Sequence, residues 1–196
     1  MARDVLAEGR FLRLIKEDGW EWAERTNASG VVVVVALTPE GRVLLVEQHR
    51  PPVRGRVIEL PAGLAGDLSG AEDEALEVAA RRELEEETGW TAARIVRLTA
   101  GPVSAGMTSE SLTFLRAEGL RRCGAGGGDE TEDIVVHEIP LDDADAWLAA
   151  RAAEGVRSTT QGNSNAKHPL LEFARQLIAS EATTLVTQNR RKMRER

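Results

Sequence analysis

The segment 71–88 constrains the fold of this chain most, because it has the composition of a helix and ends in acidic residues. It contains no glycine or proline, and Gly89, a residue type that commonly ends a helix, follows directly. At about 100° per residue, Glu83 and Glu87 lie on one face of this helix, with Glu86 beside them. Apolar residues occupy that face two turns earlier, so a stripe expected to pack on a sheet becomes a carboxylate cluster.

This carboxylate cluster is unfavourable on its own. Acids four residues apart repel by roughly a few tenths of a kcal/mol, and acids in the last turn oppose the helix dipole by ~0.3–1 kcal/mol each. Bound cations relieve such repulsion, and oxygen ligands favour Mg²⁺ or Mn²⁺. The alternative is that Glu85-Glu86-Glu87 is a solvated acidic run, which is the usual meaning of consecutive charges. Glu85 points away from the other acids, and we expect it to be solvated.

The remaining segments predict a mixed α/β (α+β) fold. Runs rich in β-branched residues, bounded by glycine and proline, indicate strands. The expected strands are 31–37, 43–48, 57–60, 92–98, 112–117 and 134–139, and the expected further helices are 142–153 and 169–180. We therefore expect one mixed β-sheet sandwiched between helices, preceded by a small N-terminal β segment.

Composition excludes several classes of partner. The net charge of −7 gives no overall attraction for nucleic acid. Cys123 is the only cysteine, so no intrachain disulfide can form. The longest apolar run, Val31–Leu37, falls far short of the ~20 residues that span a bilayer, and the N-terminus has no signal-peptide core. We expect a cytoplasmic protein that binds neither nucleic acid nor membrane.

The end of the predicted helix carries a recognisable motif. Arg82-Glu83-Leu84-Glu85-Glu86-Glu87-Thr88-Gly89-Trp90 resembles the signature of the Nudix hydrolases, R-E-U-x-E-E-x-G-U, where U is aliphatic or aromatic. Glu74 stands where that pattern has an acid before the arginine. The pattern also has a glycine at position 68, where this chain has Leu68, and Gly63 with a longer loop takes its place. This insertion leaves the role of Glu74 open.

The resemblance implies a Nudix-like mixed sheet and a division of the chain into three parts. Residues 30–181 would be the catalytic domain. Residues 1–29 would form an N-terminal strand or hairpin segment, a candidate for dimerisation. Residues 182–196 would be a basic C-terminal tail.

Flanking segments resemble the ADP-ribose pyrophosphatase branch of this family. They are Glu47-Gln48-His49-Arg50-Pro51-Pro52, Glu59-Leu60-Pro61-Ala62-Gly63, Glu130-Thr131-Glu132-Asp133-Ile134 and Trp20-Glu21-Trp22-Ala23-Glu24-Arg25. The resemblance implies that Trp20 stacks on the adenine base and that Arg25, Arg50 and Glu59 contact the substrate. It also implies a homodimer that shares the Trp20–Arg25 segment. The alternatives are a rigid surface turn at Arg50 and core packing at Trp20.

The same resemblance assigns the reaction chemistry. Glu83, Glu86 and Glu87, with the backbone carbonyl of Ala62, would hold two to three Mg²⁺ or Mn²⁺ ions. Glu130 would accept the proton of the attacking water, and Glu132 would assist it or bind metal. Alternatively, both acids are plain loop charges. The run Gly124–Gly128 predicts a flexible linker, which would make the acids after it part of a mobile lid.

The expected activity is hydrolysis of the pyrophosphate of a nucleoside diphosphate sugar, with ADP-ribose as the best candidate. A hydrolase of another sugar nucleotide, of the GDP-mannose or UDP-glucose type, is one alternative. A Nudix-fold sensor that binds nucleotide without cleaving it is another. The sensor is disfavoured by the full motif set of Arg82, Glu83, Glu86 and Glu87, because a protein that only binds has no need of metal carboxylates.

Overall fold

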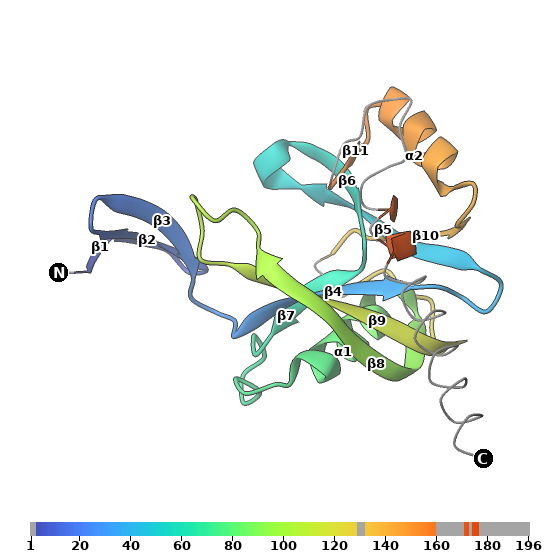
Figure 1. The fold of residues 1–196 in the computed structure, drawn as a ribbon, viewed down its shortest axis with the longest axis horizontal. Helices are drawn as coiled ribbons and strands as arrows, with labels where there is room; N and C mark the ends of the chain where they lie inside the picture. Colours follow the sequence, from blue (N-terminus) through green and yellow to red (C-terminus); the bar gives the residue numbers. More distant parts are fainter. Residues whose placement is uncertain (1–2, 129–131, 160–170, 173, 177–196) are drawn as a thin grey trace, which may run out of the picture.

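A computed structural model describes residues 3–128, 132–159, 171–172 and 174–176. The first three strands form an antiparallel sheet that projects from one end of the molecule (Figure 1). They are β1 (Asp4–Glu8), β2 (Leu12–Glu17) and β3 (Trp20–Arg25). Asp18 and Gly19, both with positive φ, make the tight turn between β2 and β3. The prediction of an N-terminal strand or hairpin segment is confirmed.

The body of the molecule contains two four-stranded sheets. The first has the order β7-β4-β9-β8, and its strands are β4 (Gly30–Ala36), β7 (Ala62–Ala65), β8 (Trp90–Pro102) and β9 (Ser111–Arg122). The second has the order β10-β5-β6-β11, and its strands are β5 (Arg42–Arg50), β6 (Gly55–Glu59), β10 (Val135–Pro140) and β11 (Arg157–Ser158). Each sheet contains one parallel pair, β4 with β9 and β6 with β11. The mixed α/β class is confirmed, with two sheets in place of one.

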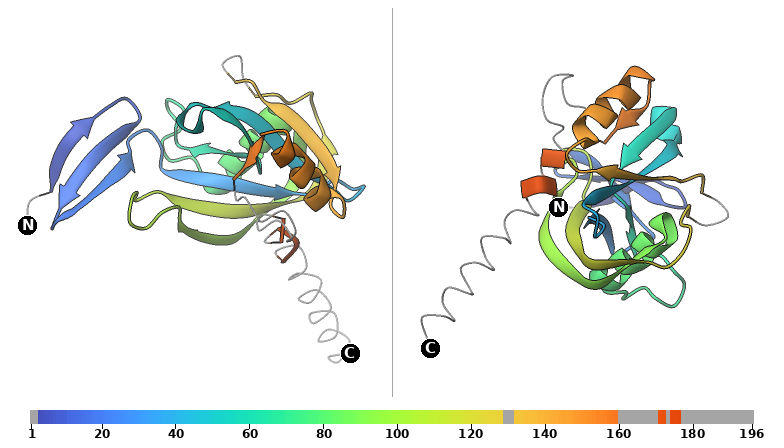
Figure 2. Two further views of the ribbon diagram at one scale, coloured as in Figure 1. Left: turned by 90° about the horizontal axis from the view of Figure 1, so that it is seen from above. Right: turned by 90° about the vertical axis from the view of Figure 1, so that its right-hand side faces the viewer.

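Two helices cover this body on opposite sides, as the end-on view in Figure 2 shows. Helix α1 (Leu76–Thr88) packs on the first sheet through its fully buried residues Ala79, Ala80 and Leu84. Helix α2 (Ala144–Ala153) covers the other side, where Ala144 and Leu148 join a second core cluster. The two cores are separated by β4, because its alternating valines face both ways.

Several element boundaries differ from the prediction for local reasons. Helix α1 begins at Leu76 and not at residue 71, because Ala75 is extended and the residues before it form turns. Strand β7 (Ala62–Ala65) was not among the expected strands. A one-turn 3-10 helix, η1 (Pro51–Val53), follows β5. Of the predicted helix 169–180, the described residues 171–172 and 174–176 are helical, and the rest lies outside the described part.

The described part of the chain contains no helix long and apolar enough to cross a membrane.

Candidate active site

A cavity of about 870 Å³ lies where α1, β7 and β6 meet the end of the N-terminal sheet. Residues that are far apart in the sequence share its wall. Seven of the predicted site residues line it: Arg25, Arg50, Glu59, Ala62, Glu83, Glu87 and Glu132. Its opposite wall is less polar and includes Thr99 to Val103, Leu112 and Phe114. The cavity therefore offers charged groups on one side and an apolar surface on the other.

Glu87 is the most buried acid of this cavity, with 3% of its surface exposed. Its Oε2 atom accepts one hydrogen bond from the backbone N–H of Ala62, at 3.0 Å. Burial raises the pKa of Glu87 to about 8, and the nearby charges of Glu83 and Glu132 add to the effect. A carboxylate in this setting gains strongly from a cation at the cavity.

Glu83 lies one turn earlier on the same face of α1. Its Oε1 atom accepts a hydrogen bond from the N–H of Leu64 at 3.2 Å. Burial raises the pKa of Glu83 to about 7, although the adjacent Arg82 opposes the shift. A β-carbon at Gly63 would overlap the end of the Glu83 side chain, so glycine at this position lets the carboxylate lie against β7. The predicted facing of Glu83 and Glu87 is confirmed.

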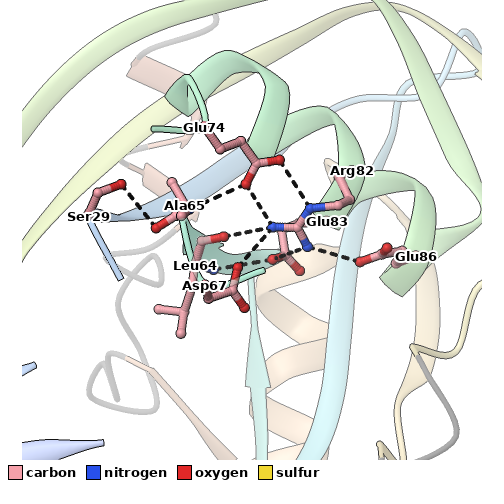
Figure 3. A network of polar contacts seen from close by, with 9 residues as sticks. Ser29, Leu64, Ala65, Asp67, Glu74, Arg82, Glu83 and Glu86 are labelled. Carbon is pink, nitrogen blue, oxygen red and sulfur yellow. Dashed lines mark hydrogen bonds and ion pairs between the residues drawn. The ribbon is translucent and has the colours of Figure 1, made fainter. Parts of the chain in front are cut away.

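Arg82 organises the acids at the edge of the cavity (Figure 3). Its guanidinium donates to the Leu64 carbonyl at 2.8 Å, to Glu83 at 2.9 Å and to Glu86 at 3.2 Å. It also makes ion pairs with Glu74 at 3.1 Å and with Asp67 at 3.3 Å. In the sequence, Arg82 was recognised only as part of the Nudix signature, and its ion pairs were not predicted. Its spacing of four residues from Glu86 was the available signal for a compensating cation.

The same arginine shows what Glu74 does in this structure. Hydrogen bonds from Arg82 lower the pKa of Glu74, so its carboxylate stays ionised beside the guanidinium. Its Oε2 atom also accepts a long hydrogen bond from the N–H of Gly66, at 3.4 Å. Glu74 therefore fixes the loop between β7 and α1 to Arg82.

The two remaining acids of the motif lie outside the cavity wall. Glu86 has 51% of its side chain exposed and turns toward Arg82. Glu85 is exposed and accepts a hydrogen bond from the hydroxyl of Thr91. The expectation that Glu85 points away from Glu83 and Glu87 is confirmed.

Two arginines reach the cavity already paired with acids. Arg50 donates to Glu59 at 2.7 Å across β5 and β6. Arg25 donates to Glu110 at 2.6 Å, at the junction of the N-terminal sheet and the body. Glu110 was not among the predicted residues, because nothing in the sequence places it beside Arg25. Each pair holds its guanidinium at the cavity in a defined orientation.

Trp20 is not at this cavity within one chain. Its side chain is 64% exposed and borders a separate hollow of about 370 Å³. That hollow lies between the β2–β3 hairpin and residues 105–109.

The run Gly124–Gly128 is not the flexible linker that its composition predicted. The N–H of Gly127 donates to the carbonyl of Glu87 at 2.8 Å, and that of Gly128 to the carbonyl of Glu86 at 3.0 Å. These bonds satisfy carbonyls that the end of α1 leaves open. The run is therefore a cap on the helix that carries the cavity acids. Glu130 lies outside the described residues, whereas Glu132 lines the cavity.

Comparison with known proteins decides the family. Residues 26–159 match the model of the NUDIX domain. The chain belongs to the Nudix family. Relatives include an ADP-ribose pyrophosphatase of Bacillus subtilis, 38% identical over 74% of this chain and 79% of that protein. A methanol dehydrogenase activator of Bacillus methanolicus is also 38% identical, over 59% of this chain and 60% of that protein.

Two further likenesses complete the comparison. A GDP-mannose pyrophosphatase of Pectobacterium atrosepticum is 33% identical to this Nudix chain, over 62% of the chain and 64% of that protein. A crystal structure titled as an ADP compounds hydrolase superposes with a TM-score of 0.63. It covers 92% of this chain and 94% of its own, at 17% identity, and so supports the fold alone.

Nudix proteins typically use divalent metal ions, and the acids of this cavity fit such ions. Glu83 and Glu87 are buried carboxylates with raised pKa values in a shared cavity, which is the donor chemistry that hard cations require. Within the described ranges, no three acidic, histidine or cysteine side chains already converge on one point. Backbone N–H groups bind Glu87 and Glu83, and Arg82 binds both Glu83 and Glu86.

Proposed function

We propose that this Nudix protein hydrolyses the pyrophosphate bond of a nucleoside diphosphate sugar, converting ADP-ribose to AMP and ribose 5-phosphate. One observation carries the proposal. The buried acids Glu83 and Glu87 share a cavity with the guanidinium groups of Arg25 and Arg50 and with the acid Glu132. An anionic substrate needs the positive groups, and hydrolysis needs the acids. The name of the Bacillus subtilis relative supports the choice of ADP-ribose.

The metal ligands in this proposal are Glu83, Glu86, Glu87 and the backbone carbonyl of Ala62. Two to three Mg²⁺ or Mn²⁺ ions would neutralise the pyrophosphate and activate a water molecule. Glu86 is exposed beside the cavity and must leave Arg82 to take part. Since Arg82 is shared among Glu74, Glu83 and Glu86, it can keep its other partners when Glu86 turns.

The remaining residues bind the substrate and move the proton. Arg50 and Arg25 present planar guanidinium groups, which suit phosphate oxygens. Glu59 and Glu110 orient them through the ion pairs described above. Glu132 is supported as the acceptor of the water proton, because it lines the cavity with Glu83 and Glu87. Glu130 is the competing candidate, two residues earlier in the chain.

A homodimer is part of the proposal. In it, the Trp20 end of the Trp20–Arg25 segment of one copy would reach the site of the other, where Trp20 would stack on the adenine base, while Arg25 lines the cavity of its own chain. The exposure of Trp20, away from the cavity of its own chain, supports this arrangement.

GDP-mannose is the second candidate substrate, since a relative at 33% identity carries that name. A panel of nucleotide sugars incubated with purified protein and Mg²⁺, with products separated by chromatography, tests the choice. We expect the highest kcat/KM for ADP-ribose. A clear preference for GDP-mannose or a UDP-sugar would replace ADP-ribose, and binding of nucleotide without any cleavage would support the sensor.

A further inference from the structure

Two described residues near Glu132, Gly128 and Asp133, are held by other elements. Before Glu132, the N–H of Gly128 donates to the carbonyl of Glu86, at the end of α1. A β-carbon on Gly128 would overlap the Glu132 side chain, so the two residues are in close contact. After it, the side chain of Asp133 is bound by Arg56 of β6, at 2.7 Å. The helix with the cavity acids and the second sheet therefore both fix Glu132.

Arg56 joins Asp133 to a buried charge in the body of the protein. Its Nη1 and Nη2 atoms donate to the carboxylate and the carbonyl of Asp133, at 2.7 and 3.3 Å. Its Nε and Nη2 atoms donate to the carboxylate and the carbonyl of Glu47, at 2.7 and 3.0 Å. A planar guanidinium bound at four points has a fixed direction as well as a fixed place.

Glu47 is itself held in place by several hydrogen bonds, so it anchors Arg56. Burial would raise the pKa of Glu47, but hydrogen bonds from His137, Arg151 and Arg56 outweigh it, so the pKa is lowered and the carboxylate stays ionised. Its Oε2 atom accepts hydrogen bonds from Arg151 at 2.8 Å and from His137 at 2.9 Å. The cluster thus ties β5, β6, β10 and α2 together behind Arg56.

We propose that Arg56 is a positioning residue, which places Glu132 in the cavity beside Glu87 by holding the neighbouring Asp133. The inference rests on the proposed function only in giving Glu132 a part in the reaction. The tether itself is a structural claim that can be tested without substrate. Arg56 does not line the cavity, so it can affect the reaction only through the residues that it binds, Asp133 on one side and Glu47 on the other.

The size of each effect separates a positioning role from a stabilising one. The Asp133 side chain is 78% exposed, and ion pairs of exposed groups contribute little to stability. A reacting group displaced by about 1 Å can nevertheless lose about 100-fold in rate. Loss of the tether should therefore lower kcat while the fold stays intact.

Two variants remove the tether in different ways. Arg56→Met deletes the bridge, and Asp133→Asn weakens it without touching Glu47, which guards against misfolding of the first variant. Arg122→Met is the matched control, because Arg122 pairs with Glu138 of β10 at 2.5 Å, whereas Asp133 pairs with Arg56. We expect kcat to fall at least about 10-fold in both tether variants, with KM little changed and no comparable fall in the control. The melting temperature should change little in Asp133→Asn but fall in Arg56→Met, because that variant also takes a partner from the buried Glu47.

A double-mutant cycle shows whether Arg56 acts through Glu132. In a Glu132→Gln background, Arg56→Met should cause almost no further loss of kcat, because the group it positions is already gone. An equal loss with and without Glu132 would overturn the proposal. So would a control variant that is as slow as the tether variants.

Hydrogen–deuterium exchange tests the tether independently of activity. The amides of Glu132 to Ile134 should exchange several-fold faster in Arg56→Met and Asp133→Asn than in the wild type, and Arg122→Met should leave them unchanged. This result would stand even if the protein cleaved no nucleotide sugar, so the two proposals fail separately. Unchanged exchange in both tether variants would refute the positioning role.

Discussion

At the scale of single residues, acids close together on α1 differ in burial, and we expect them to differ in their contribution to activity. Glu87 is buried in the cavity with a raised pKa, while Glu85 is exposed two positions earlier. Glu87→Gln should lower kcat/KM for the preferred sugar nucleotide by at least about 100-fold, a usual cost of losing one electrostatic contact at a reacting centre. Glu85→Gln should stay near the wild-type value. Steady-state kinetics on both variants decide the matter, and similar losses at the two positions would contradict the assignment.

A second prediction at this scale separates the reacting end of the substrate from the base. Glu132→Gln should lower kcat with little change in KM, the mark of an interaction made mainly in the transition state. Trp20→Ala should mostly raise KM. The rise should correspond to a loss of ~1–3 kcal/mol of binding free energy, which is what stacking of a base on an aromatic ring contributes. Glu130→Gln is the comparison variant. If it alone collapses kcat, the proton acceptor lies two residues earlier.

The residues that sequence reasoning found and missed differ in a physical way. Helical periodicity is enough to place Glu83 and Glu87 on one face, because both lie on a single element. The partners of Arg82 include Leu64 and Asp67, which only the folding of β7 against α1 brings close. Contacts between elements are not encoded in local spacing, so the role of Arg82 in bridging the acids was not predicted.

At the scale of elements, the two raised pKa values make α1 sensitive to pH. An acid whose pKa is higher in the folded state adds stability that is fully present below its ordinary value of 4.5 and is lost as pH rises through the folded pKa. For Glu83 and Glu87 that loss runs from about pH 5 to pH 9. The metal-free melting temperature should therefore fall over this window, and Mg²⁺ should raise it more at pH 8 than at pH 5.

Thermal unfolding with and without Mg²⁺ across this pH range measures the effect. In Glu87→Gln the metal-free slope should be shallower, because one of the two titrating groups is gone. A metal-free protein whose melting temperature does not respond to pH, or a variant with an unchanged slope, would argue against buried ionisable acids at this site.

The glycine cap of α1 supplies a further prediction at this scale. Gly126 has a φ of +72°, and a β-carbon there would overlap the backbone of Thr88. Gly126→Ala should destabilise the fold by about 1–3 kcal/mol, the usual cost of a strained backbone. Gly106→Ala is the control, because its β-carbon would meet open space. Chemical denaturation compares the two, and equal stability would mean that the run does not cap the helix.

The elements themselves could be predicted from the sequence to different degrees. Strands β4 and β5 and the end of α1 follow from valine runs and from Gly89, which are local signals. The start of α1 was predicted five residues too early, because Ala75 is extended and the N–H groups of Ala71 and Glu74 make turn hydrogen bonds. Glycine content suggested flexibility at 124–128. In the structure, the N–H groups of Gly127 and Gly128 bind carbonyls at the C-terminal end of α1, a contact that local sequence does not reveal.

At the scale of the whole molecule, the N-terminal sheet carries exposed apolar side chains that include Val5, Leu6, Phe11 and Leu12. A homodimer would cover such groups and would bring Trp20 of one copy to the cavity of the other. We expect a dimer at micromolar concentration by light scattering. Deletion of residues 1–25 should give a monomer with a much higher KM. A wild-type monomer with full activity would rule out the shared site.

The central claim is that this cavity cleaves a pyrophosphate bond with the help of divalent metal. Phosphorus NMR of the wild-type protein with ADP-ribose follows that bond directly. With Mg²⁺ present, the two pyrophosphate signals should disappear and two phosphomonoester signals, of AMP and ribose 5-phosphate, should replace them. Excess chelator should stop the change. Persistence of the pyrophosphate signals with Mg²⁺, or cleavage that continues under chelation, would contradict the account.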